Sequence, residues 1–160
     1  MRRLRLPIVA AVVALAGGCQ GDPYYDDYAR ARPATADLVG TWELDPARSD
    51  WRPAPGTPAI ARSFRLDADG TAVANAIPDV FALGPGGKAA GAADLAGPGR
   101  WRLSFDQGAF WTLRVAIPAG PGADPGVEVI LHPIGQASPY QIYATIGDPD
   151  EGRKLAFKRR

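Results

Sequence analysis

Apolar and polar residues alternate with a period of two along much of this chain. Trp101, Leu103 and Phe105, for example, stand at every second position, which we call one parity, while arginine and serine stand at the positions between them, the other parity. This period places the two sets on opposite faces of a β-strand, so we expect one buried and one wet face. Strand-like runs cover residues 38–44, 60–66, 71–77, 100–105, 111–117, 127–131, 140–146 and 154–158. The pattern therefore predicts about eight short strands.

The segments between these runs favour antiparallel pairing. Most are short and rich in Gly, Pro and Asp, as at 67–70, where the text DADG is typical of a hairpin turn. No long amphipathic helix is present for a crossover between parallel strands. We expect an all-β fold, a single antiparallel up-and-down barrel or curled meander of about eight strands, with a two-sheet β-sandwich as the alternative. A short helical turn is expected at 78–83 and a Gly- and Ala-rich loop at 84–99.

Composition and charge narrow the class of protein. Glycine and proline supply 19 and 16 of the 160 residues, which disfavours a helical bundle. The formal charge of +1 excludes a strongly basic nucleic-acid binder. The single cysteine excludes an intramolecular disulfide and any multi-cysteine metal site. We expect one domain with no metal, no cofactor and no nucleic-acid partner.

The first nineteen residues have the pattern of a secretory signal. Three arginines precede an uncharged apolar run at 6–16, which is too short to span about 30 Å of hydrocarbon. The run ends in LAGGC, and this ending resembles the lipobox of bacterial lipoproteins. The resemblance implies cleavage before Cys19 and its acylation by fatty acids such as palmitate. The alternative is an ordinary secretory signal that leaves Cys19 as a free thiol.

These patterns divide the chain into three parts. Residues 1–18 are expected to be the signal peptide, 19–36 the lipidated Cys19 with a flexible tether, and 37–160 the barrel-like domain. The text of 20–36 lacks any strand or helix period and reaches about 20–25 Å as a random coil. Loss of residues 1–18 leaves 142 residues with 15 basic and 17 acidic side chains, a balance of −2. We expect a cell-envelope protein, anchored by lipid to a membrane and facing the periplasm or the exterior.

Two resemblances support this organisation. Gly40-Thr41-Trp42 resembles the Gly-x-Trp motif of lipocalin and lipocalin-like families, which implies that Trp42 closes the base of a barrel. In those families a basic residue near the last strand packs over the tryptophan, a part that Lys154, Lys158 or Arg159 would take here. The series GTW, FRLDADGT, IPDVF, GRWRL and YQIYATIGDPDEGRKLAF is similar to an uncharacterised family of small bacterial envelope lipoproteins. That second resemblance implies fold and location only.

Catalytic and metal chemistry find little support in the residues. The single histidine, His132, stands before a proline at a strand end, and no serine stands in a Gly-x-Ser-x-Gly elbow. The acidic segments 67–70 and 148–152 lack the ligand spacing of an EF-hand loop and are interpreted as turns. The Gly-rich run at 84–88 lacks a Walker pattern. We therefore expect a protein that is not an enzyme.

The remaining hypotheses concern binding. In the first, a small apolar ligand occupies the barrel interior; in the alternative, the core is solid and the protein is an envelope protein-interaction or assembly module. The module would use the tyrosine-rich segment 20–36 and the loop 84–99, and the basic C-terminal end would lie near anionic headgroups or in solvent. The candidate ligand-binding residues are Trp42, Phe64, Trp101, Phe105, Trp111, Val129, Ile142 and Phe157.

Overall fold

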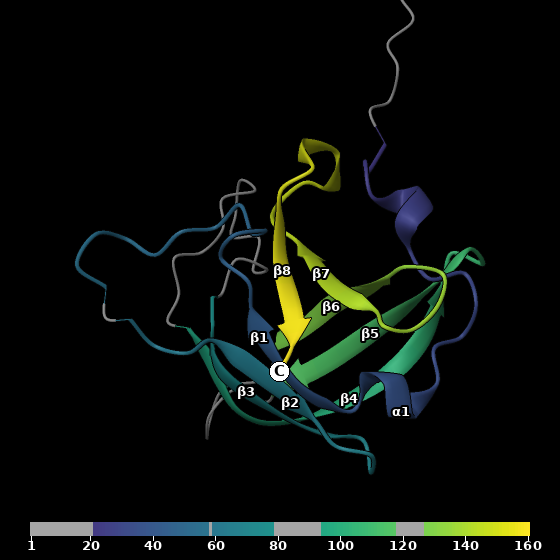
Figure 1. The fold of residues 1–160 in the computed structure, drawn as a ribbon, viewed down its shortest axis with the longest axis horizontal. Helices are drawn as coiled ribbons and strands as arrows, with labels where there is room; N and C mark the ends of the chain where they lie inside the picture. The colour runs from purple at the N-terminus through teal and green to yellow at the C-terminus, as the bar shows by residue number, and fades with distance from the viewer. Residues whose placement is uncertain (1–20, 58, 79–93, 118–126) are drawn as a thin grey trace, which may run out of the picture.

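Each predicted strand-like run forms a strand in the computed structural model, which describes residues 21–57, 59–78, 94–117 and 127–160. The strands pair antiparallel with their sequence neighbours, and the last pairs with the first, so the sheet closes into a barrel (Figure 1). The strands are β1 (Gly40–Leu44), β2 (Ser63–Leu66), β3 (Thr71–Ile77), β4 (Leu95–Asp106), β5 (Phe110–Ile117), β6 (Val127–Ile134), β7 (Gln141–Thr145) and β8 (Lys154–Arg159). The expected up-and-down barrel is confirmed, and the sandwich alternative is not adopted.

The apolar side chains, which occupy alternate positions of the strands, fill the barrel interior. Strand register pairs Trp42 with Phe64 and Ile142 with Phe157, which places large side chains from neighbouring strands on the inner face. Burial of this apolar surface is the main force that stabilises the closed sheet. The side chains buried most completely in the core are Leu38, Trp42, Leu66, Leu113, Leu131, Ile142, Leu155 and Phe157.

Strand β4 begins earlier than the sequence predicted. It starts at Leu95, inside the segment expected to be a loop, because glycine permits a close approach between strands. A Cβ atom on Gly99 would lie 2.3 Å from the carbonyl oxygen of Ala116 on β5. Only a residue without a side chain fits there. The helical turn expected at 78–83 and the rest of the expected loop lie almost wholly outside the described residues.

Both acidic segments form turns, as expected. In the β2–β3 turn, the Gly70 nitrogen donates to the Asp67 carbonyl and Gly70 adopts a φ of 81°. The second segment forms a short 3₁₀ helix, η2 (Pro149–Glu151), where the Asp148 carboxylate accepts from the Asp150 nitrogen. The Asp148 carboxylate thus caps a backbone group of its turn.

A single helical turn, α1 (Thr35–Leu38), crosses one end of the barrel. The Trp42 indole donates to the Leu38 carbonyl at 2.8 Å, which fixes this turn over the Gly-x-Trp position. Of the three basic candidates, Arg159 lies at this end and donates to the carbonyls of Asp37 and Val39. Within the described part of the chain, no helix is long and apolar enough to cross a membrane.

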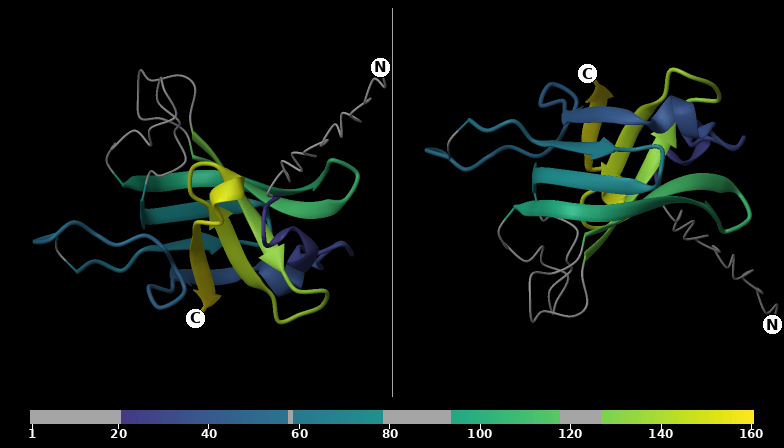
Figure 2. Two further views of the ribbon diagram at one scale, coloured as in Figure 1. Left: turned by 90° about the horizontal axis from the view of Figure 1, so that it is seen from above. Right: turned by 90° about the horizontal axis from the view of Figure 1, so that it is seen from below.

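The segment expected to be a tether packs against the barrel instead. We call residues 22–33 the N-terminal strap; it contains a 3₁₀ helix, η1 (Tyr25–Asp27), and lies beside β6 and β7 (Figure 2). Tyr28 and Ala29 are only 2% and 1% exposed. Composition missed this packing because it depends on single tyrosines and not on a period. The signal peptide and Cys19 lie outside the described residues, so their assignment stays a prediction.

Candidate functional site

The barrel interior offers very little space. The cavity among its inner side chains has a volume of about 10 Å³ and is lined by residues such as Phe64, Leu131 and Phe157. This is about the space that one water molecule needs. Five of the eight candidate ligand-binding residues, Trp42, Phe64, Val129, Ile142 and Phe157, are packed into this core. A sixth, Trp101, is also buried, and its indole donates to the Asp67 carbonyl at 2.8 Å.

The last two candidates lie elsewhere, which corrects the prediction for them. Phe105 is 49% exposed and Trp111 is half-buried, because the β4–β5 hairpin extends beyond the closed part of the barrel. Their rings pack on each other with centroids 5.3 Å apart, and the Arg32 guanidinium lies over the Trp111 ring. Their parity was predicted correctly, but parity does not show where a strand leaves the barrel.

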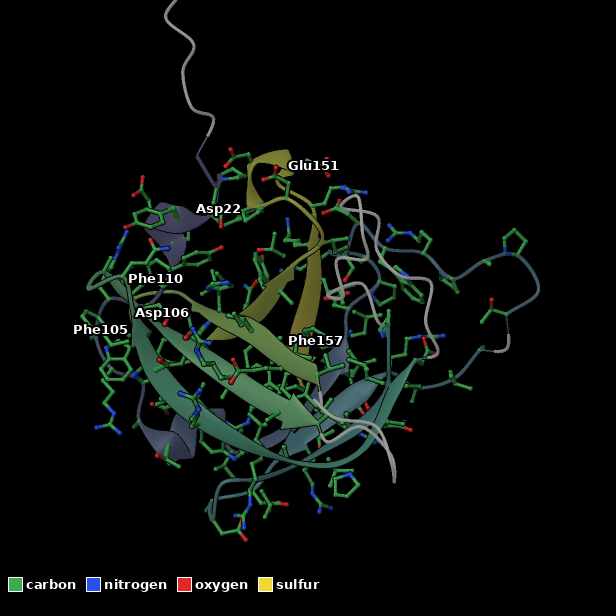
Figure 3. The ribbon with its side chains drawn as sticks, turned by 180° about the vertical axis from the view of Figure 1, so that it is seen from behind. Asp22, Phe105, Asp106, Phe110, Glu151 and Phe157 are labelled. Carbon is green, nitrogen blue, oxygen red and sulfur yellow. The ribbon has the colours of Figure 1, made fainter. Side chains whose placement is uncertain are left out.

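The larger hollow lies on the outer face of the sheet. Its volume is about 420 Å³, and it extends from the β4–β5 turn across β6 to the segment that follows β7. In Figure 3, Asp106 and Phe110 lie on one side of this region, and Asp22 and Glu151 lie above it. The lining residues are Asp106, Gln107, Phe110, Arg114, Glu128, Ile130, His132, Thr145, Gly147 and Pro149.

A network of charged side chains forms the floor of the hollow. Arg114 donates to both oxygens of Asp106, at 2.9 and 3.0 Å, and to Glu128 at 2.8 Å. Arg102, which lies opposite Arg114 on β4, also donates to Glu128. Charge-assisted contacts of this kind restrict the direction of the guanidinium and of the carboxylates. The floor is therefore a rigid polar surface.

Asp106 is held in its charged form by these contacts. Partial burial alone would raise the pKa of its carboxyl, but the hydrogen bonds from Thr112 and Arg114 outweigh that effect and lower it. The Thr112 hydroxyl is fully buried and donates at 2.7 Å. At neutral pH the hollow thus contains a charged carboxylate that is paired with the Arg114 guanidinium.

His132 lines the hollow beneath the strap. Its ring stacks on Tyr28, with centroids 4.2 Å apart and planes inclined by 11°, and lies 5.8 Å from the ring of Phe110. Burial lowers the pKa of its imidazole to about 4, against attraction from Asp22 and Asp106. The Nδ1 atom is buried and has no hydrogen-bond partner among the described residues. His132 is therefore neutral at physiological pH and adds no positive charge to the site.

The strap forms the wall beside His132. The Tyr28 hydroxyl donates to Asp22, and burial followed by this carboxylate raises the pKa of the phenol. Tyr24 packs edge-on against Tyr143 of β7 at 5.6 Å, and the ammonium of Lys154 lies 4.1 Å from its ring centre. The wall therefore joins the N-terminal segment to the outer face of β7 and β8.

The sequence pattern did not reveal this hollow, because most of its residues occupy the strand positions that are expected to face solvent. Arg114 and Thr112 stand at polar positions of the alternating pattern, which predicts contact with solvent, and His132 stands before a proline at a strand end. One signal was present: Ile130 is an apolar residue on the polar parity of its strand, within reach of paired opposite charges on neighbouring strands. Among the described residues, no group of three or more His, Cys, Asp and Glu side chains is placed to hold a metal ion.

The fold and the site define a closed eight-stranded antiparallel barrel with a filled interior and a polar hollow on its outer face. Comparison with protein-family models, curated proteins and solved structures found no match for this chain. Functional inference therefore depends on the chain's own residues.

Proposed function

We propose that this protein is a lipid-anchored, non-enzymatic protein of the cell envelope that binds a basic group of a partner protein in its outer hollow. The observation that carries the proposal is the contrast in volume, about 420 Å³ outside against about 10 Å³ inside the barrel. Ligand sites in proteins have volumes of about 300–1,000 Å³, a range that includes the hollow but not the cavity inside the barrel.

The charge of the hollow favours a cation. Its lining contains the carboxylates of Asp106 and Glu128 but only one basic side chain, Arg114. Arg102 also pairs with Glu128 but does not line the hollow, and His132, which does, is neutral. A positively charged group would offset the one unit of negative charge that remains among the lining residues.

The apolar part of the lining favours a long basic side chain. Phe110, Ile130 and Pro149 supply carbon surface beside the carboxylates. Lysine and arginine side chains carry an alkyl stem that covers apolar surface and a charged tip that seeks polar groups. The lining thus matches a lysine or arginine on the surface of a protein partner, in agreement with the interaction-module hypothesis.

A titration of the full chain with a small lysine probe tests this proposal. We expect N-acetyl-lysine amide to shift the backbone amide resonances of Glu128, Ile130 and His132, and its uncharged analogue N-acetyl-norleucine amide to leave them in place. Glu128→Gln should weaken binding by about tenfold, since it removes one charge-assisted contact. Glu43→Gln is the matched control, because Glu43 also pairs with an arginine on the barrel but lies outside the hollow. Equal shifts with both probes would contradict the proposed cation site.

The location is tested separately at Cys19. If this residue carries the lipid, Cys19→Ala should abolish incorporation of labelled palmitate and move the protein from the membrane fraction to the soluble fraction. Several acyl chains anchor firmly, because each buried CH₂ contributes about 0.8 kcal/mol. A Cys19→Ala variant that still sediments with membranes would contradict the anchor.

A further inference from the structure

We propose that the N-terminal strap holds the barrel directly at the membrane surface, with the end that carries η2 facing the lipid. This inference rests on the lipid anchor at Cys19 in the proposed function. It replaces a freely rotating domain on a tether by a domain with a defined orientation.

The strap is fixed to the barrel by backbone hydrogen bonds along its length. The Ala29 nitrogen donates to the Pro133 carbonyl, the Gly135 nitrogen donates to Asp27, and the Trp111 nitrogen donates to Ala29, each at 2.9 Å. The buried Tyr28 ring adds its stack on His132. Such paired backbone groups and buried aromatic surface resist detachment.

The strap leaves very little free chain before the anchor. Gly21 is the first described residue, and it is two residues from Cys19. Two extended residues span at most about 7 Å, whereas the tether expected from composition would reach about 20–25 Å. An acylated Cys19 would therefore bring the start of the strap close to the headgroups.

The contacts of Pro23 identify the surface that lies nearest. A Cβ atom on Gly152 would lie 2.9 Å from the Pro23 Cγ atom, so the start of the strap packs on the turn that contains η2. Figure 1 shows the same arrangement, with η2 and the start of the described chain together at the top. Helix α1 and the β2–β3 turn lie at the other end, together with the C-terminal arginines. This orientation directs the basic C-terminus away from the lipid.

The charge of this end shows which force would hold it at the membrane: the lipid anchor, and not attraction between the protein surface and the headgroups. In the start of the strap (22–30) and the turn that contains η2 (148–154), acidic side chains outnumber basic ones, six to three: Asp22, Asp26, Asp27, Asp148, Asp150 and Glu151 against Arg30, Arg153 and Lys154. Anionic headgroups repel such a surface. The hollow has Gly147 and Pro149 on one rim, so it would open beside the membrane, where a membrane-bound partner presents its side chains.

Energy transfer on the lipidated full chain tests the orientation. A donor dye is attached at Glu151→Cys near η2 or at Ala68→Cys in the β2–β3 turn; the acylated Cys19 does not react with the dye. The acceptor is carried by headgroups in vesicles of phosphatidylethanolamine with a minority of phosphatidylglycerol. We expect the donor at position 68 to be farther from the lipid by about 20 Å, the length of a short strand. Equal distances from both positions would overturn the inference.

Two further variants show whether the strap is the cause. A Gly-Ser linker as long as the expected tether, inserted between Gly21 and Asp22, should keep lipidation but remove the difference between the two positions. Tyr28→Ala should reduce the difference, and Tyr28→Phe should retain it, because the phenylalanine ring still stacks on His132. An unchanged difference with the linker would overturn the role of the strap. Loss of lipid from the unmodified chain would remove the anchor itself, whereas equal distances in lipidated protein remove only the orientation.

Discussion

The ring of His132 couples the stability of the protein to pH. It is enclosed by Tyr28 and Phe110 and is close to Asp22, Asp106 and Arg114, and burial lowers the pKa of its imidazole from 6.5 to about 4. In the unfolded chain the imidazole takes up a proton near pH 6.5, so the unfolded state binds more protons between pH 6.5 and 4. Stability from the neutral ring is therefore complete above pH 6.5 and is lost as pH falls through this window. The expected loss is about 3 kcal/mol.

His132→Phe isolates this effect. The variant keeps an aromatic ring against Tyr28 but takes up no proton, so its free energy of unfolding should fall less between neutral pH and pH 4 than that of the unmodified chain. Urea unfolding at both pH values gives the comparison, and the carboxylates titrate equally in the two proteins. Identical pH dependence in the two chains would contradict a buried neutral His132.

Strand formation was predictable because it depends on a local period. All eight runs of alternating or apolar residues became strands, and their pairing places most of the apolar side chains inside the barrel. The strap was not predictable in this way. Its text has no period, and its stability comes from single contacts, such as Tyr28 on His132, that exist only after the sheet has formed. The hollow was not predictable for a related reason. Polar residues alternate with apolar ones in the same way whether they face solvent or form a polar site.

The close approach of β4 and β5 makes a prediction at Gly99. Gly99→Ala would place a methyl group 2.3 Å from the Ala116 carbonyl oxygen, which is backbone and cannot move without shifting the strand. We expect a loss of about 1–3 kcal/mol in the free energy of unfolding, as for other overpacked sites. Thermal unfolding followed by circular dichroism measures it.

The control for this prediction is Gly108→Asn in the β4–β5 turn. Gly108 has a φ of 65°, but a Cβ atom added there would meet open space, with nothing within 4 Å. Asparagine tolerates the left-handed region better than other residues with a side chain, so this variant should unfold close to the unmodified chain. If Gly99→Ala is as stable as Gly108→Asn, the two strands do not approach as closely as described.

For the molecule as a whole, the decisive question is whether the barrel carries a ligand or supports one outside. Lipocalin-like barrels and solid barrels share strand number and parity, so the sequence left both hypotheses open. The difference arises from how the side chains on opposite walls fill the shared volume, which depends on packing in three dimensions. Large rings such as Trp42, Phe64 and Phe157 share one core with small residues such as Ala74 and Ala144, and about 10 Å³ is left between the described residues.

This packing predicts that the unmodified protein takes up no apolar reporter in its core, whereas Phe157→Ala does. Phe157 lines the small cavity, so its removal enlarges an apolar space that stays dry and accepts small hydrophobic molecules. The truncation should also cost about 3–5 kcal/mol of unfolding free energy. Fluorescence of 1-N-phenylnaphthylamine measures uptake, and Phe105→Ala is the matched control, because Phe105 is 49% exposed and its loss opens no internal space. Two results would show instead that the barrel is a carrier: dye bound by the unmodified chain, or a lipid found with it by native mass spectrometry and lost in Phe64→Trp. Either result would contradict the central role of the outer hollow in the proposed function.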